Sequence, residues 1–296
     1  MKVLVIGCHG FIGTHLKAYL QKLQYDVIGA DIKSLNNETF VLDKDVNNLH
    51  VLLQNHNFDF CINASGSATV AFSVEHEEED ALLNYKNVVT MLQAFEKYQN
   101  KCKFINLSSA AVYGNPIIFP INEQCHTNPI SPYGKHKMWS EQALAKYALE
   151  NQMQTLSLRI FSVYGNGLKK QLFWDIYLKT LLSDEIELLG NGSETRDFIH
   201  INDLLEATQI IMHHAKFDGS AINVASGVAV SINNAAHTLI NYLSSKINIT
   251  FSGKAAPENP IHWLADITKL KQIGFRPKIT LKQGLKNYAA WLRELN

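Results

Sequence analysis

Residues 3–13 read VLVIGCHGFIG: four apolar residues that predict a buried strand, followed by glycines at positions 7, 10 and 13. The residues after the last glycine have the apolar spacing of a helix, which we expect from about Gly13 to Leu23. Glycines between a strand and a helix permit a tight turn and let a pyrophosphate approach the backbone N–H groups at the positive end of the helix. The segment therefore predicts a dinucleotide-binding loop, for which a purely structural turn is the alternative.

An acidic residue stands where such a loop needs one. Asp31 ends the second apolar strand, residues 27–30, and lies 18 positions after Gly13. A carboxylate there accepts hydrogen bonds from the adenosine ribose hydroxyls and repels a 2′-phosphate. The sequence therefore favours NAD as cofactor, while Lys33 nearby offsets part of the repulsion and leaves NADP open.

Strands and helices alternate along the first half of the chain. Further strands are expected at 58–62, 103–107 and 155–160, and long helices at 81–98 and 133–150. This order predicts an α/β fold, a Rossmann-type doubly wound parallel sheet with a smaller C-terminal substrate lobe. We expect the nucleotide domain at 1–165 and the substrate lobe at 166–296, the two being intertwined across a soft boundary.

Composition narrows the function classes. Lys and Arg together number 27, as do Asp and Glu, so there is no electrostatic case for a nucleic-acid or membrane-surface partner. No apolar run approaches the roughly 20 residues that span a bilayer, and no leader is seen before the first strand. Four cysteines without metal-ligand spacing predict reduced thiols, a cytoplasmic protein and no metal site.

Tyr133 and Lys137 lie one helical turn apart. Side chains four residues apart share a helix face about 5–6 Å apart, so we expect the Lys137 ammonium beside the Tyr133 phenol. At an effective dielectric near 20 such a charge is worth roughly 4 kcal/mol, or about three pKa units. The spacing thus predicts a tyrosine pKa near neutrality and a general acid/base for a carbinol. The alternative is an ordinary surface helix with a solvated lysine.

Seven ordered motifs resemble one family. They are the 7–13 loop, Asn63-Ala64-Ser65-Gly66, Asn84, the SSAAVYG segment 108–114, the Tyr133/Lys137 pair, RIFSVYG at 159–165, and GSETRDFIH at 192–200. The chain resembles the extended short-chain dehydrogenase/reductases that act on nucleotide-sugars, which include 4-epimerases, 4,6-dehydratases and 4-keto-sugar reductases. The resemblance runs over nearly the whole length.

The resemblance implies roles for particular residues. The implied catalytic group is Ser109, Tyr133 and Lys137, with Ser109 on the reacting sugar oxygen and Lys137 also on the nicotinamide ribose. Implied cofactor contacts are Gly7, His9, Gly10, Phe11, Ile12, Gly13, Asp31, Asp45, Val46, Asn63, Ala64, Ser65, Tyr133 and Lys137. Implied substrate contacts are Ser109, Tyr133, Ser162, Trp174 and Arg196. An ordinary loop explains Asp45 and Val46 equally well, and the alternative for Arg196, the implied diphosphate ligand, is a salt bridge between lobes.

Departures from the family pattern narrow the chemistry. Ala110 and Ala111 stand where dehydratases and decarboxylases of this family carry an acid, which disfavours dehydration, and Ala68 and Ser162 replace two common 4-epimerase residues. We expect an NAD-dependent nucleotide-sugar 4-epimerase that works through a 4-keto intermediate. A reductase of a nucleotide-linked 4-keto-6-deoxy-sugar is the alternative, which the compact length favours. A non-catalytic dinucleotide sensor is a third reading, disfavoured by the complete catalytic group. A homodimer formed through the two long helices is expected by the same resemblance.

Overall fold

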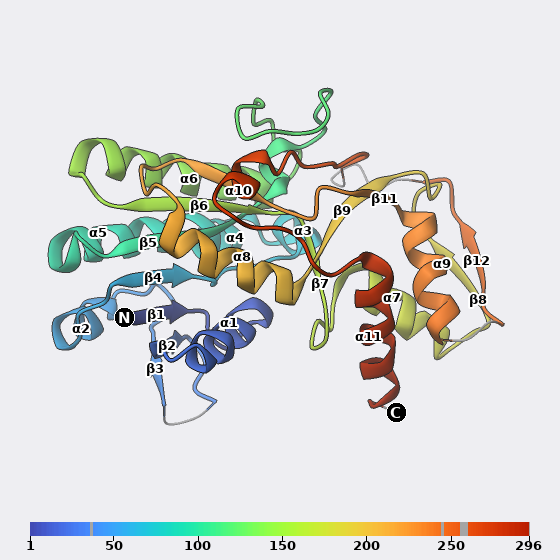
Figure 1. Ribbon diagram of the computed structural model, residues 1–296, viewed down its shortest axis with the longest axis horizontal. Coiled ribbons are helices and arrows are strands. Elements are labelled where there is room, and N and C mark those ends of the chain that lie inside the picture. Colours follow the sequence, from blue (N-terminus) through green and yellow to red (C-terminus); the bar gives the residue numbers. More distant parts are fainter. Residues whose placement is uncertain (36–37, 244–245, 255–259, 296) are drawn as a thin grey trace.

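A seven-stranded parallel sheet forms the centre of the computed structural model, which describes residues 1–35, 38–243, 246–254 and 260–295 (Figure 1). Its strands are β1 Lys2–Ile6, β2 Asp26–Asp31, β3 Thr39–Val41, β4 Phe60–Asn63, β5 Lys103–Ser109, β6 Thr155–Ile160 and β10 Ala221–Val224. They lie in the order β10-β6-β5-β4-β1-β2-β3. The strand order reverses beside β1, where ligands bind in doubly wound sheets. The predicted fold class is confirmed.

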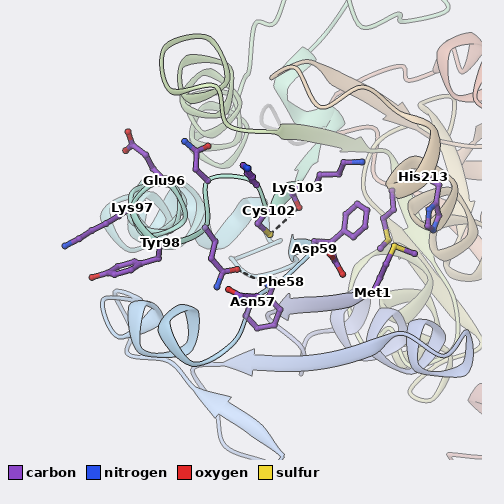
Figure 2. Close-up of a pocket in the computed structure, with 15 residues that line it drawn as sticks. Met1, Asn57, Phe58, Asp59, Glu96, Lys97, Tyr98, Cys102, Lys103 and His213 are labelled. Carbon is purple, nitrogen blue, oxygen red and sulfur yellow. Dashed lines mark hydrogen bonds between the residues drawn. The ribbon is translucent and has the colours of Figure 1, made fainter.

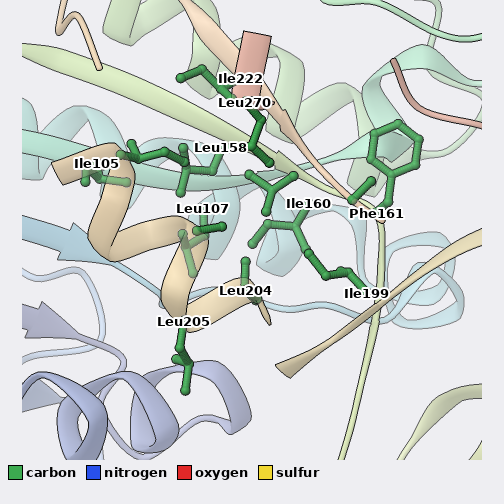
Figure 3. Close-up of a cluster of buried hydrophobic side chains, with 14 of the residues drawn as sticks. Ile105, Leu107, Leu158, Ile160, Phe161, Ile199, Leu204, Leu205, Ile222 and Leu270 are labelled. Carbon is green, nitrogen blue, oxygen red and sulfur yellow. The ribbon is translucent and has the colours of Figure 1, made fainter. Parts of the chain in front are cut away.

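Both faces of the sheet are buried, because alternate residues of β1 enter different cores. Val3 and Val5 join one cluster with side chains from α1 Phe11–Lys22 and α8 Ile201–His214. Figure 3 shows Leu204 of α8 on the side of Ile160 of the sheet, while Leu205 points away from the sheet. Leu4 and Ile6 of β1 join the opposite cluster, which the helices α2 Leu49–Asn55, α5 Asn87–Gln99 and α6 Pro132–Asn151 complete.

A second group of elements has its own core beside the sheet (Figure 1). The strands β7 Ser162–Tyr164, β9 Thr195–His200 and β11 Ala229–Ser231 form one small sheet, and β8 Glu185–Leu188 pairs with β12 Asn248–Phe251. The helices α7 Gln171–Thr180, α9 Ile232–Leu243 and α11 Leu281–Arg293 pack around side chains such as Phe173, Leu239 and Tyr288. Two short helices, α3 Val70–Glu75 and α10 Thr268–Gln272, lie in the connections between these elements.

Two expectations differ from the observed elements. The helix expected at 81–98 starts earlier, as α4 Glu77–Ala81, and is interrupted by a π-helical turn, Leu82–Lys86, before α5. The seventh strand, β10, comes from the second half of the chain and pairs with β6. The central sheet therefore includes a strand from beyond residue 165, and α8, also from the second half of the chain, packs against this sheet. The division into two intertwined lobes stays a prediction. No helix among the described residues is long and apolar enough to cross a bilayer.

A buried charge network holds α6 against the sheet. Arg159 of β6 donates through Nη2 to Glu141 of α6 at 2.7 Å, and its Nε lies 3.1 Å from both carboxylate oxygens. The Ser108 hydroxyl donates to the same carboxylate at 2.5 Å. Arg159 Nη1 also donates to the Tyr113 hydroxyl, which donates in turn to Asn223 of β10. One carboxylate therefore connects α6 to three strands.

Replacing Glu141 by Gln should destabilise the fold by about 3 kcal/mol, because the Arg159 charge loses its counter-charge in a buried place. Urea unfolding of the two proteins measures the difference. Glu150→Gln is the matched control, since Glu150 lies on the same helix in an exposed pair with Lys146 and such pairs contribute little. Equal unfolding midpoints for Glu141→Gln and Glu150→Gln would contradict the assignment.

Candidate active site

The glycine-rich loop has the shape that an approaching pyrophosphate requires. Gly7 has φ +78°, and Gly10 N–H donates to the Gly7 carbonyl at 3.0 Å. A Cβ on Gly13 would lie 2.0 Å from that carbonyl oxygen, and one on Gly7 would lie 2.6 Å from Ser65 N. There is therefore no room for a side chain at Gly7, where the loop contacts the residues after β4, or at Gly13. The helix α1 begins at Phe11, and the free N–H groups of its first turn face the loop.

Asp31 closes the other side of this loop. Its carboxylate accepts the N–H of His9 at 3.0 Å and the N–H of Lys33 at 3.1 Å. The His9 ring nitrogen Nε2 is buried and has no partner among the described residues. Glycines that leave room, a carboxylate at the end of β2 and an unpartnered ring nitrogen together fit a dinucleotide. Val46 is buried in the core cluster and Asp45 accepts from Asn47, so the ordinary-loop alternative suits this pair better.

Polar side chains of β4 and β5 form hydrogen bonds beside the glycine-rich loop. Asn63 Oδ1 accepts from Ser65 N–H at 3.1 Å and from the Ser65 hydroxyl at 2.5 Å. The Asn63 amide donates to Asn106 Oδ1 at 2.8 Å. These bonds fix the turn after β4, at which Gly66 takes φ +110°.

A cavity of about 850 Å³ lies between the sheet and the second group of elements. Of the residues expected at the site it is lined by Ile12, Ala64, Ser65, Ser109, Tyr133, Lys137, Ser162 and Arg196. Gly7, His9, Gly10, Phe11, Gly13, Asp31, Asp45, Val46, Asn63 and Trp174 are outside its lining. The three expected catalytic residues are therefore brought together with the expected diphosphate ligand, while the nucleotide loop lies beside the cavity.

A second cavity, of about 790 Å³, lies at the other end of the strands, where β4 and β5 begin. Figure 2 shows Phe58, Cys102, Lys103 and His213 around it. It contains none of the expected site residues. The carboxyl ends of the strands therefore carry the chemistry, as in other doubly wound sheets.

The expected pKa of Tyr133 near neutrality is wrong for this structure. Burial raises the pKa of Tyr133 to about 12. The negative charge of Asp80 also raises this pKa, whereas the hydrogen bond with Ser109 lowers it. The Lys137 ammonium lies 5.9 Å from the centre of the Tyr133 ring and donates to the Leu107 carbonyl at 2.9 Å. Desolvation of the phenol is therefore the dominant effect, and the lysine is turned toward β5.

Lys137 itself is fully enclosed, and burial lowers its pKa to about 8, against opposing effects of Asp80 and Glu141. A buried lysine with one carbonyl partner retains two N–H donors for a ligand. Ser109 is held by its own hydroxyl, which accepts the N–H of Ala111 at 3.1 Å at the start of a 3₁₀ turn. The site thus presents a hydroxyl, a phenol and an amine to one cavity.

Arg196 is a desolvated cation on β9. Its guanidinium carbon lies 5.5 Å from the centre of the Trp263 ring, and Nη1 donates to the Thr195 carbonyl at 2.8 Å. No carboxylate among the described residues forms an ion pair with it, so the salt bridge between lobes is not formed. Burial lowers the pKa of Arg196 to about 10, with Glu194 acting in the opposite direction. An uncompensated cation of this kind suits an anionic ligand.

The expected substrate contact of Trp174 is not supported. Its ring lies 5.3 Å from Tyr177 and 6.3 Å from Trp291 of α11, outside the cavity. Lys170 and Phe173 line the cavity instead, from the start of the same helix. Lys170, Thr69, Ile130 and Trp263 were missed, because no spacing in the sequence connects these positions to the catalytic motifs.

Residues 3–225 match the model of the NAD dependent epimerase/dehydratase family. The chain belongs to this family. A putative UDP-glucose 4-epimerase of Methanocaldococcus jannaschii is 27% identical over 99% of both chains, and a dTDP-4-dehydro-6-deoxyglucose reductase of Escherichia coli is 27% identical over 96% of this chain and 95% of its own. The crystal structure of a UDP-glucuronic acid 4-epimerase from Bacillus cereus, in complex with UDP-glucuronic acid and NAD, is 28% identical, covers both chains completely and superposes with a TM-score of 0.89.

The family match confirms the expected resemblance and the expectation of an enzyme of this type. It also agrees with the geometry, since the matched range begins at the first strand and ends at β10, the last strand of the sheet. Members with different reactions have similar chains, so the reaction of this epimerase/dehydratase family member is argued from its own residues.

Replacing Lys137 by Met should stabilise the dinucleotide-free protein at neutral pH. The lysine pKa falls from 10.5 to about 8 on folding, which at ~1.36 kcal/mol per unit corresponds to a cost of about 3 kcal/mol for holding the charge. Between pH 8 and 10.5 the unfolded chain binds more protons than the folded one, so wild-type stability rises with pH there. Urea unfolding at pH 7 and pH 10 should show the advantage of Lys137→Met shrinking, and a constant difference would contradict the assignment.

Proposed function

We propose that this protein is an NAD-dependent nucleotide-sugar 4-epimerase. The carrying observation is that Ser109, Tyr133 and Lys137 line one cavity with Arg196, while Ala111, which lines it too, has no proton to exchange. A hydroxyl and a phenol suffice to move the proton of a carbinol, and the two alanines after Ser109 supply no acid or base for a dehydration. The UDP-sugar 4-epimerases among the relatives and structures support the same class.

In the proposed reaction, Ser109, Tyr133 and Lys137 have different roles at the sugar C4 carbinol. Tyr133 takes the hydroxyl proton as general base and returns it as general acid, while Ser109 hydrogen-bonds the same oxygen. Lys137 holds the nicotinamide ribose through the N–H groups that its bond to Leu107 leaves available. A bound NAD would supply the acceptor and donor for the C4 hydride. The 4-keto sugar turns within the cavity between the two transfers, so that the configuration at C4 inverts.

The remaining contacts belong to the substrate nucleotide and the cofactor. Arg196 binds the diphosphate, where its planar fork meets two phosphate oxygens. Asp31 hydrogen-bonds the adenosine ribose, and the loop from Gly7 to Gly13 binds the pyrophosphate of NAD. Ser162 contacts the sugar from the start of β7.

A homodimer belongs to this proposal. The helices α5 and α6 pack together on one face of the sheet. Leu149 is 84% exposed and Trp139 is 36% exposed, both on α6. These two exposed apolar side chains lie on a helix that is expected to contact the second copy.

A reductase of a nucleotide-linked 4-keto-6-deoxy-sugar is the second candidate, favoured by the reductase of Escherichia coli among the relatives. The same three residues would then protonate the developing alkoxide, but the cofactor would have to exchange at each turnover. Retention of the dinucleotide therefore distinguishes the two reactions.

Freshly purified protein should carry nearly one NAD per chain and interconvert UDP-glucose and UDP-galactose. Denaturation followed by chromatography measures the dinucleotide, and Tyr133→Phe should keep it while losing on the order of 10³-fold in rate. An empty protein that oxidises NADH or NADPH with a 4-keto sugar would replace the epimerase by the reductase. Full activity in Tyr133→Phe would contradict both reactions.

Replacing Arg196 by Met should raise the KM for UDP-glucose by about 10- to 100-fold, the value of a charge-assisted hydrogen bond lost in both ground and transition states. The kcat should change little, because the diphosphate does not react. Arg276→Met is the control, since Arg276 donates to the Lys271 carbonyl outside the cavity. An unchanged KM in Arg196→Met would remove Arg196 from the diphosphate site.

A further inference from the structure

A buried carboxylate stands directly behind the catalytic helix. Asp80, of α4, accepts a hydrogen bond from His136 Nδ1 at 2.7 Å through Oδ2. Its other oxygen accepts from the Asn84 amide at 2.9 Å. The side chains of Asp80 and His136 are 0% and 2% exposed, and Asn84 is fully buried. Three polar side chains thus form a closed group under the surface.

The group touches the catalytic machinery at two places. His136 precedes Lys137 on α6 and follows Tyr133 by three residues, yet its ring is directed at α4 and is not in the lining of the cavity. Asn84 lies in the π-helical turn, and a Cβ on Gly66, a cavity residue, would lie 2.3 Å from its Oδ1. That oxygen is buried and has no partner among the described residues. The group therefore connects the helix of Tyr133 and Lys137 to the wall of the cavity.

We propose that Asp80, held by His136 and Asn84, is a positioning residue whose buried charge keeps Lys137 protonated and Tyr133 protonated until substrate and cofactor are in place. The inference rests on the proposed function of the cavity. It assigns a task to residues that contact neither sugar nor dinucleotide.

Coulomb's law gives the direction in which the charge of Asp80 shifts the pKa values of Lys137 and Tyr133. A negative charge behind the helix favours the ammonium of Lys137 and disfavours a second anion at Tyr133. Both effects are present: Asp80 raises the pKa of Lys137 against desolvation and also raises the pKa of Tyr133.

Asp80 is paired with the His136 imidazole, which is charged only when protonated, so among the described residues this carboxylate has no permanent counter-charge. Glu141, which also acts on Lys137, is paired with Arg159. The acidic side chains on α3 and α4 near this face, Glu75, Glu77, Glu78 and Glu79, lie at the surface and are solvated or, for Glu79, paired with Lys44. Tyr113, from the 3₁₀ turn against α6, is hydrogen-bonded to Arg159.

The test is Asp80→Asn, which removes the charge and keeps the shape. The Asn84 amide can turn over, so that its unpartnered oxygen accepts from the new amide, which makes the replacement compatible with the fold. In the proposed reaction the two limbs of the pH–rate profile belong to Tyr133 and Lys137 as an interacting pair. We expect both limbs to move to lower pH by about one unit, the size of shift that one nearby charge causes. The KM for UDP-glucose should stay within about twofold.

A spectroscopic readout separates this inference from the proposed function. The near-ultraviolet absorbance of the Tyr133 phenolate, obtained by subtracting the same titration of Tyr133→Phe, should begin to rise at lower pH in Asp80→Asn than in wild type. That measurement needs no turnover, so inactivity toward UDP-sugars would overturn the proposed function alone. An unmoved phenolate onset would overturn the role of Asp80.

Two further variants complete the design. Asp203→Asn is the matched control, because Asp203 is a buried aspartate that accepts from the N–H groups of Lys278 and Ile279, away from the cavity, and its profile should not move. Should Asp80→Asn unfold, Asp80→Asn/His136→Gln replaces both partners by amides, and the same downward movement of both limbs is expected. Limbs that stay in place or move upward in the folded variant would refute the proposal.

Discussion

The contact of Glu141 with Arg159 fixes the helix on which the rest of the site depends. Tyr133, His136 and Lys137 all lie on α6, and each acts in a different direction from it: into the cavity, toward α4 and toward β5. A rotation of α6 by a fraction of a turn would remove all three interactions together. The bidentate pair of Glu141 and Arg159, joined to Ser108 and Tyr113, sets that rotation one helical turn after Lys137. A single structural ion pair thus determines the geometry of three groups that take part in, or adjust, proton transfer.

The site is assembled from groups that folding alone would not favour. Lys137 and Arg196 are both desolvated cations whose pKa burial lowers, and no carboxylate in the described part of the chain forms an ion pair with either. A buried cation without a counter-charge destabilises the fold, which the three hydrophobic cores offset. Under the proposed function, an anionic ligand at Arg196 would supply a missing negative charge. Its binding would then recover part of the desolvation cost that weakens the free protein.

Short-range patterns in the sequence predicted the framework, and long-range contacts account for what it missed. The strand, loop and helix around Gly7, Gly10 and Gly13 were predictable because their chemistry is contained in a dozen consecutive residues. The low pKa predicted for Tyr133 was wrong because spacing shows neither the burial of the phenol, which raises its pKa, nor the bond of the Lys137 ammonium to the Leu107 carbonyl of another strand. The substrate contact of Trp174 stays a prediction, since its ring packs against Tyr177 and Trp291 and is not in the lining of the cavity. The pair of Asp80 and His136 could not be found, since its members are 56 positions apart.

The two alanines after Ser109 show how finely the backbone selects the chemistry. Ser109 begins a 3₁₀ turn, Ala110–Tyr113, so successive side chains point in different directions. Ala110 is fully buried in the hydrophobic core, whereas Ala111 lines the cavity. An acid at position 110 would need burial among apolar side chains, and only one at position 111 would meet a substrate. With alanine at position 111, the 3₁₀ turn therefore adds no acid or base next to Ser109 and Tyr133, which suits the proposed oxidation and reduction at a single carbinol.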